Sequence, residues 1–140
     1  MPAGIIQTQG PPRHVLLALD NLLTQGKFQI ALDQATKLLK QFPNSAILCN
    51  ACGASSSGLN QLDSAIVSFK RALKIKPDYA LPYFNIGTML EKKGDLEGAI
   101  ESYTQAIKIE PNNATYHYNM GIALQKSGNF LAATKSYKQT

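Results

Sequence analysis

An all-α fold made of repeated helical hairpins is predicted by three features of the sequence. Similar residues recur at intervals of 34, apolar residues within each interval follow a helical period, and a turn signal divides each interval in two. The composition agrees with this prediction, since 44% hydrophobic and 16% charged residues are ordinary for a folded chain. At 140 residues the chain has the length of about one domain, so a large multidomain enzyme is not expected.

The 34-residue interval is visible at four kinds of position simultaneously. A proline closes each interval, a glycine lies inside its first half, and an alanine followed by an aromatic residue marks its second half. These positions are Pro43, Pro77 and Pro111; Gly53, Gly87 and Gly121; Ala31, Ala65, Ala99 and Ala133; and Phe69, Tyr103 and Tyr137. Such agreement indicates one structural unit repeated along the chain.

The elements follow in order from this division. We expect residues 1–11 to be a disordered or irregular leader and the rest to form units at 12–45, 46–79, 80–113 and 114–140, the last incomplete. In the third unit, two helical stripes of apolar residues lie on either side of Gly94-Asp95, and Pro111 ends the second stripe. Each unit is therefore predicted to be a pair of antiparallel helices.

This pattern resembles the tetratricopeptide repeat (TPR) family along nearly the whole chain from residue 12. The resemblance implies a right-handed α-solenoid of about four hairpins, in which the first helix of each unit lines a concave groove that binds extended peptides or partner helices. The first unit departs from the family pattern, because Leu19 stands where glycine is expected and Ala35 where an aromatic residue is expected.

The resemblance also points to a peptide-binding site. Asn85 and Asn119 are 34 residues apart, and Asn50 lies one residue earlier in its own unit; such carboxamides can hold a peptide backbone, as in the asparagine ladder of O-linked N-acetylglucosamine transferase arrays. Neighbouring aromatic and lysine side chains suit a peptide with apolar and acidic residues. Alternatively, Phe84 and Tyr118 pack against adjacent helices. The expected groove comprises Asn50, Phe84, Asn85, Thr88, Lys92, Tyr118, Asn119, Ile122 and Lys126.

No residues are expected to catalyse a reaction or to hold a metal or cofactor. Cys49 and Cys52 form a CxxC pair, but a thioredoxin-type site needs a strand before its helix and a structural zinc site needs four ligands. We therefore expect two buried packing residues. His14 and His117 have no partner at a metal-ligand spacing, and we expect them to be surface or packing residues.

The net charge of +5 belongs to the first half of the chain. Residues 1–76 carry eight basic and three acidic side chains, whereas residues 77–140 carry six of each. The densest basic cluster is Lys70, Arg71, Lys74 and Lys76, at the end of an expected helix, where cations are favourable. A nucleic-acid site would place arginines and aromatic residues together on one face, so we expect a solvated surface and no nucleic-acid partner.

The chain also lacks the features of membrane or secreted proteins. It has no run of about 18 apolar residues, the length that would span a bilayer. Its first residues have neither the basic nor the apolar part of a secretory signal. We expect no membrane partner and a cytoplasmic location.

Together these observations predict a non-catalytic interaction module that binds a peptide segment of a partner protein. The alternative is the N-terminal substrate-recognition region of a longer bacterial-type glycosyltransferase or sulfotransferase. The last unit stops within its second helix, so we expect Phe130, Ala133 and Tyr137 to be partly uncovered. A second copy stacked on that face would give a homo-oligomer.

Overall fold

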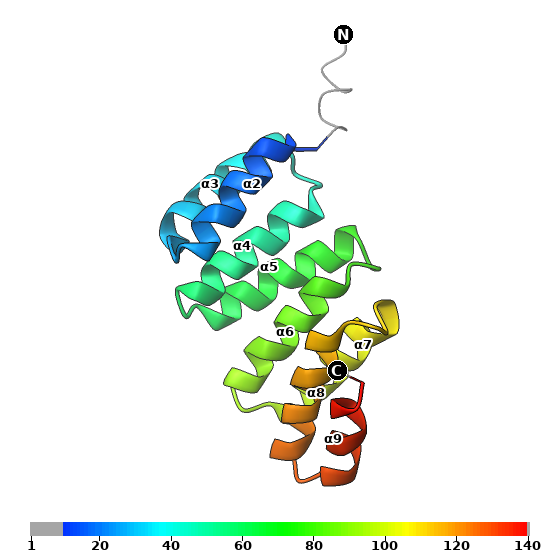
Figure 1. Ribbon diagram of the computed structural model, residues 1–140. Helices are drawn as coiled ribbons and strands as arrows, with labels where there is room; N and C mark the ends of the chain where they lie inside the picture. Colours follow the sequence, from blue (N-terminus) through cyan, green and yellow to red (C-terminus); the bar gives the residue numbers. More distant parts are fainter. Residues whose placement is uncertain (1–9, 140) are drawn as a thin grey trace. The chain divides into compact units, whose positions relative to one another are not determined.

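The computed structural model describes residues 10–139, and every regular element in that range is an α-helix (Figure 1). Residues 1–9 of the expected leader lie outside the described residues. None of the described helices is long and apolar enough to cross a membrane. The helices are α2 (Arg13–Thr24), α3 (Phe28–Gln41), α4 (Ala46–Gly58), α5 (Leu62–Ile75), α6 (Ala80–Lys92), α7 (Leu96–Ile109), α8 (Ala114–Lys126) and α9 (Phe130–Tyr137).

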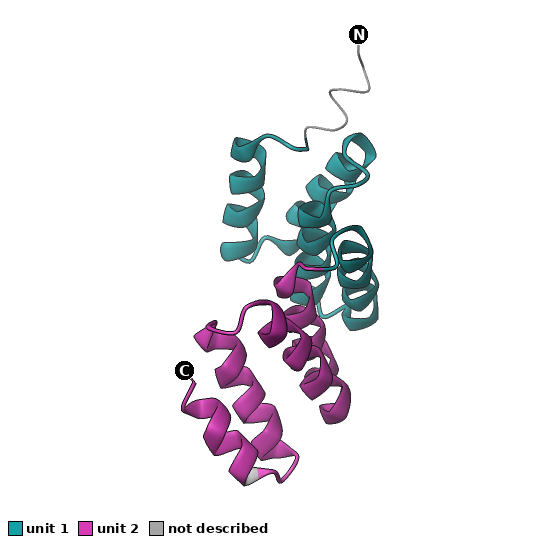
Figure 2. Cartoon of the chain, turned by 90° about the vertical axis from the view of Figure 1, so that its right-hand side faces the viewer, with its two compact units in different colours: residues 1–77 teal, residues 78–140 magenta. Residues whose placement is uncertain are grey.

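The chain divides into two compact units, residues 1–77 and residues 78–140 (Figure 2). Helices α2 to α5 belong to unit 1 and helices α6 to α9 to unit 2, so each unit holds two hairpins. Within the units, α4 packs on α5, α6 on α7 and α8 on α9. The division coincides with the charge asymmetry, because the excess of basic residues lies entirely in unit 1.

The turn inside each hairpin requires a left-handed backbone at one recurring position. Gly26, Gly94 and Gly128 have φ values of 75°, 87° and 88°, and Asn60 occupies the same place in the second hairpin with a φ of 60°. Glycine adopts this conformation without steric cost, and asparagine is among the few other residues that tolerate it. The turn signal in the sequence is therefore a backbone requirement.

The recurring glycine and aromatic residue meet inside one hairpin. A Cβ atom added at Gly87 would lie 2.5 Å from the ring of Tyr103, so only a residue without a side chain fits beneath that ring. The first and second helices of the hairpin can thus approach closely while a large ring fills the core. The same contact joins Gly53 to Phe69 and Gly121 to Tyr137.

In the first hairpin the large core residue lies on the first helix and the small one on the second, the reverse of the other hairpins. Its first helix carries the large Leu19 and its second helix the small Ala35, and both are buried in one cluster. The core of this hairpin thus still combines a small and a large residue, although the helix that supplies each has changed. The two departures of the first unit from the repeat pattern therefore compensate each other.

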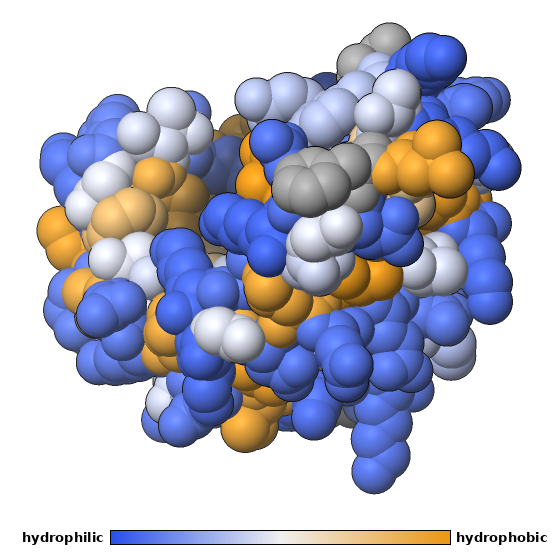
Figure 3. Space-filling model, turned by 90° about the horizontal axis from the view of Figure 1, so that it is seen from below, coloured by the Kyte–Doolittle hydropathy of each residue, from blue (hydrophilic) through white to orange (hydrophobic). Residues whose placement is uncertain are grey.

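The expectation of an uncovered last helix is wrong for Ala133. Its exposed fraction is 2%, because α9 packs on α8 within its own hairpin. Tyr137 is half-buried against Gly121, and its hydroxyl donates to Gln125 Oε1 at 2.8 Å. The Phe130 side chain lies outside the described part of the structure. Among the described side chains of α9, Leu131 is the large apolar one that is exposed, at 86%. Hydrophobic surface on the face shown in Figure 3 forms patches separated by hydrophilic side chains.

Candidate functional site

Helices α6, α7 and α8 of unit 2 line an open hollow of about 300 Å³, which we call the lysine hollow. Four of its lining residues belong to the groove expected from the sequence, and they come from the first helices of two successive hairpins. Glu91 and Tyr103 are the two that sequence reasoning did not include. The lining consists of Thr88, Glu91 and Lys92 on α6, Tyr103 on α7, and Asn119 and Lys126 on α8.

Helical spacing explains why these side chains share one face. Thr88, Glu91 and Lys92 are at positions i, i+3 and i+4 of α6, which lie on the same side of a helix. Asn119 and Lys126 are seven residues apart on α8, two helical turns along one face. The repeat therefore brings equivalent faces of α6 and α8 to the same hollow.

Glu91 is the centre of the polar contacts in the lysine hollow. The Tyr103 hydroxyl donates to Glu91 Oε1 at 2.9 Å, and Lys126 Nζ donates to Glu91 Oε2 at 2.6 Å. The Glu91 side chain is 14% exposed and that of Lys126 is 54% exposed. Both carboxylate oxygens are thus occupied, and the charged acceptor strengthens both hydrogen bonds.

The sequence did not reveal Glu91 because the residue does not repeat. Ser57 and Gln125 occupy its position in the neighbouring units, and its partner Lys126 is 35 residues away. One sequence signal could have found it: a side chain that can accept a hydrogen bond stands 12 residues before the recurring tyrosine in the last two units, Glu91 before Tyr103 and Gln125 before Tyr137. In the structure each tyrosine hydroxyl donates to that side chain. A polar acceptor for the tyrosine hydroxyl is therefore a recurring feature of the last two hairpins.

The electrostatic balance of the lysine hollow is positive. Burial, together with the hydrogen bond to Glu91 and its charge, raises the pKa of Tyr103 well above its ordinary value, so this residue remains a neutral donor. Two lysines face one glutamate, which leaves a surplus of one positive charge. Lys92 is exposed, and among the described residues no ion pair is found for it. The hollow can therefore attract an anionic group.

The amide of Asn119 keeps hydrogen-bonding capacity for a ligand. Its Nδ2 donates to the Thr115 carbonyl oxygen on its own helix at 2.9 Å, which orients the side chain and uses one of its two N–H groups. The carbonyl Oδ1 is an acceptor that a peptide N–H could use. The Thr88 hydroxyl, by contrast, donates to the Asn85 carbonyl oxygen at 2.8 Å.

The other expected groove residues of unit 2 lie outside the lining. The Phe84 ring stacks on Tyr116 with centroids 4.9 Å apart and lies 5.7 Å from the Tyr103 ring, which supports the packing alternative for this residue. Tyr118 is exposed on α8, with its ring centroid 5.9 Å from that of Tyr137.

Two further expected residues in unit 2 and one in unit 1 are also outside the lysine hollow. Asn85 on α6 and Ile122 on α8 are half-buried. Asn50 is buried on α4, in unit 1. The structure thus joins Thr88, Lys92, Asn119 and Lys126 in one place and leaves the remaining members of the expected groove elsewhere.

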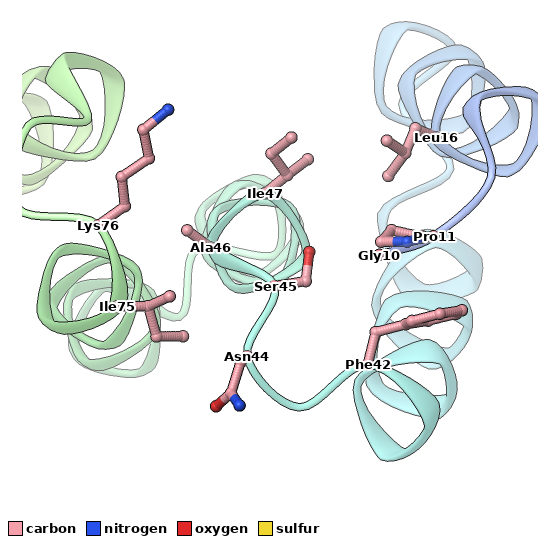
Figure 4. Close-up of a pocket in the computed structure, with 10 residues that line it drawn as sticks. All are labelled: Gly10, Pro11, Leu16, Phe42, Asn44, Ser45, Ala46, Ile47, Ile75 and Lys76. Carbon is pink, nitrogen blue, oxygen red and sulfur yellow. The ribbon is translucent and has the colours of Figure 1, made fainter. Parts of the chain in front are cut away.

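Unit 1 has a larger hollow, of about 680 Å³, at the start of α4 and the ends of α3 and α5 (Figure 4). Leu16 on α2 and Ile47 on α4 lie on opposite sides of it, and Phe42 and Ile75 add apolar surface. Lys76 is its charged member. Its residues come from helix ends and loops of both hairpins, which is why the repeat pattern gave no sign of it.

The cysteines and His117 occupy packing positions, as expected from the sequence. Cys49 and Cys52 are free and buried, and burial raises the pKa of both thiols. His117 is buried, and its Nε2 donates to the Pro111 carbonyl oxygen at 2.7 Å. His14 is exposed. Among the described residues, no three histidine, cysteine, aspartate or glutamate side chains are grouped closely enough to hold a metal ion.

Comparison with solved structures supports the helical repeat fold. The chain is 23% identical to a protein described as "Crystal structure of MamA", with a TM-score of 0.80 over 89% of this chain and 73% of the other. A second structure, MamA from residue 41 to the end from Desulfovibrio magneticus RS-1, is 21% identical, with a TM-score of 0.79 over 94% of this chain and 74% of the other. At this level of identity the likeness concerns the fold. No curated protein sequence gives a significant match.

A family model supplies the sequence evidence. The model, described as a TPR repeat, matches residues 59–94 and again residues 89–128. Together the two matches cover residues 59–128, half of the chain, and they include helices α5 to α8. The matched segment also contains the glycine and aromatic contact of the third hairpin, between Gly87 and Tyr103. The chain therefore belongs to the tetratricopeptide repeat family.

Proposed function

We propose that the chain is a non-catalytic protein-interaction module whose lysine hollow binds an extended, acidic segment of a partner protein. Membership of the TPR family supports the general role. The observation that carries the specific role is the surplus positive charge of Lys92 and Lys126 around Glu91, next to the amide of Asn119. This combination suits a peptide with a carboxylate and a polar backbone.

Each lining residue has a distinct part in this proposal. Lys92 is exposed and reaches the partner carboxylate as a flexible point charge. Lys126 is held in position by Glu91, so less side-chain freedom is lost when the partner binds. Asn119 accepts a backbone N–H of the partner through Oδ1, because its Nδ2 is already directed at Thr115. The backbone contact gives affinity, and the lysines give the preference for acidic residues.

The role of Glu91 is to limit the charge of the hollow and to order it. Its carboxylate offsets one of the two lysines, so a single unpaired anion of the partner completes the charge balance. The Tyr103 hydroxyl donates to the Glu91 carboxylate from the buried side, because the Tyr103 ring lies in the core against Gly87. This hydrogen bond thus links α6 to α7 at the hollow.

The proposal is tested with an array of short peptides of random sequence, probed with the labelled chain. The peptides that bind are expected to be enriched in aspartate and glutamate. For one such peptide, Lys92→Glu should weaken binding about tenfold, because an attractive charge becomes repulsive. Lys108→Glu on the exposed side of α7 makes the same charge change outside the hollow and should alter affinity much less.

Two results would overturn this function. Bound peptides without acidic enrichment would show that the positive surplus does not select partners. An equal effect of Lys92→Glu and Lys108→Glu would show that only the overall charge of the unit matters. Measurement at two salt concentrations adds a further check, since the contribution of exposed charges falls as salt rises.

A further inference from the structure

The two cysteines of unit 1 lie beside a cavity of about 200 Å³ between α3, α4 and α5. Leu32 and Leu39 of α3 give it apolar lining, and Thr36 of α3 with Ser68 and Arg71 of α5 complete the lining. Arg71 is exposed, so the cavity reaches the surface at this residue. The cysteines are therefore buried, at 1% and 7% exposure, yet they border a space that a small molecule could enter.

The spacing of the thiols disfavours a direct bond between them. Cys49 and Cys52 are at positions i and i+3 of α4, where Cβ atoms lie about 5–6 Å apart. A disulfide requires Cβ atoms about 3.5–4.5 Å apart, so it would distort the helix. A single atom that bonds both sulfurs spans the gap with less movement of the backbone.

The surroundings favour a ligand that leaves no charge in the cavity. Burial keeps both thiols protonated at neutral pH. The effects that lower their pKa values are smaller: the Arg71 charge acts on Cys49, and a hydrogen bond with Thr36 and the Arg71 charge act on Cys52. A divalent metal ion would need further ligands to complete its shell, but the described residues offer no group of three suitable side chains there. A neutral atom that bonds to both sulfurs brings no charge into the cavity and needs no further ligand from the protein.

We propose that Cys49 and Cys52 form a dithiol site for a trivalent arsenical, with its organic group against Leu32 and Leu39. An arsine oxide, in which arsenic bears one carbon substituent and one oxygen, is the matching reactant. Two S–H bonds and the arsenic–oxygen bond break, two arsenic–sulfur bonds form, and both protons leave with the oxygen as one water molecule. Arsenic stays trivalent, so no oxidant or reductant is required.

The experiment uses phenylarsine oxide and the full, reduced chain. Native mass spectrometry should show one phenylarsenic group per chain, with helicity unchanged by circular dichroism. Alkylation followed by peptide mapping should show that both thiols become protected together. The melting temperature should rise, because a ligand that binds the folded state stabilises it.

Variants separate the site from ordinary thiol reactivity. Cys49→Ser and Cys52→Ser each leave one thiol, and each should weaken binding at least tenfold, since the chain has no other cysteine. Ser68→Leu keeps both thiols but fills the cavity, and it should also lower binding. Ser64→Leu makes the same change at an exposed position of α5 outside the cavity and should leave binding intact.

Three outcomes would overturn the proposal. One is an adduct that forms only after denaturation or that lowers the melting temperature, because the folded site would then not accept the ligand. Another is full binding by either single-cysteine variant. The third is rapid formation of a Cys49 to Cys52 disulfide in mild oxidant without loss of helicity, which would contradict the spacing argument. If the serine variants fail to fold, joint protection of both thiols in the unaltered chain still decides.

Discussion

Replacing Glu91 by glutamine should lower stability and raise affinity for an acidic peptide at the same time. Glutamine keeps an oxygen that can accept from the Tyr103 hydroxyl, as Gln125 does for Tyr137 in the last hairpin. It removes the negative charge that offsets Lys126. The two effects have opposite signs because Glu91 stabilises the fold while it reduces the positive charge of the hollow.

The stability change follows from the contacts of Glu91. Its ion pair with Lys126 is half exposed on the lysine side, so its loss costs less than about 1 kcal/mol. The hydrogen bond from Tyr103 changes from a charged to a neutral acceptor, which costs about 1 kcal/mol. We expect Glu91→Gln to cost about 1–2 kcal/mol of unfolding free energy. Glu91→Ala should cost more, because it leaves the buried Tyr103 hydroxyl without its acceptor.

The affinity change follows from the charge count. Removing one glutamate charge raises the surplus of the lysine hollow from one positive charge to two. An added charge interaction at the solvent-exposed edge of a protein is worth about 1 kcal/mol, which corresponds to roughly a fivefold gain in affinity.

The assays are urea denaturation followed by circular dichroism, and fluorescence anisotropy with an acidic peptide from the array. Glu101→Gln removes the same charge from an exposed position of α7 and serves as the control. It should leave stability nearly unchanged and raise affinity only slightly. A folded Glu91→Gln chain with weaker peptide binding would refute the reasoning, because Glu91 would then act mainly as a partner contact.

Three further predictions concern packing, thiol chemistry and the turns. Gly53→Leu and Phe69→Ala should each destabilise the chain, by about 1–3 and about 3–5 kcal/mol of unfolding free energy. The double variant should cost at least about 2 kcal/mol less than the sum of the two single changes. If urea denaturation shows that the two costs simply add, the size exchange inferred for the first hairpin is contradicted. Burial raises the pKa of both Cys49 and Cys52 above the ordinary thiol value, so the folded chain holds these protons at a pH where the unfolded chain releases them. Stability should therefore fall as pH rises above about 8.5, the ordinary thiol pKa. In thermal denaturation a variant with serine at both positions should lose this fall, and an unchanged fall would contradict the assignment. Asn60→Gly should leave the free energy of unfolding unchanged or raise it by a few tenths of a kcal/mol, because Asn60 has a φ of 60° and glycine adopts this left-handed backbone without steric cost. A loss above about 1 kcal/mol on thermal denaturation would mean that the asparagine side chain is needed.

Part of the candidate site could be predicted from the repeat pattern together with the family resemblance. Thr88, Lys92, Asn119 and Lys126 were expected to share a face, and they line one hollow, because helical spacing and a 34-residue repeat place equivalent side chains on equivalent faces. The contacts of Phe84 could not be predicted in this way. Its position on α6 does not reveal that the ring stacks on Tyr116, which depends on the side chain that α8 presents to it.

The helices, their turns and the family can be read from the amino-acid sequence, because they depend on local backbone preference and on a hydrophobic pattern that recurs in every unit. The tertiary structure decided which side chains meet between helices. Only there does Glu91 join Tyr103 to Lys126, and only there are Leu19 and Ala35 found in the same buried cluster. The physical reason is that a helical period specifies a face, whereas a contact across two faces depends on residues that need not repeat.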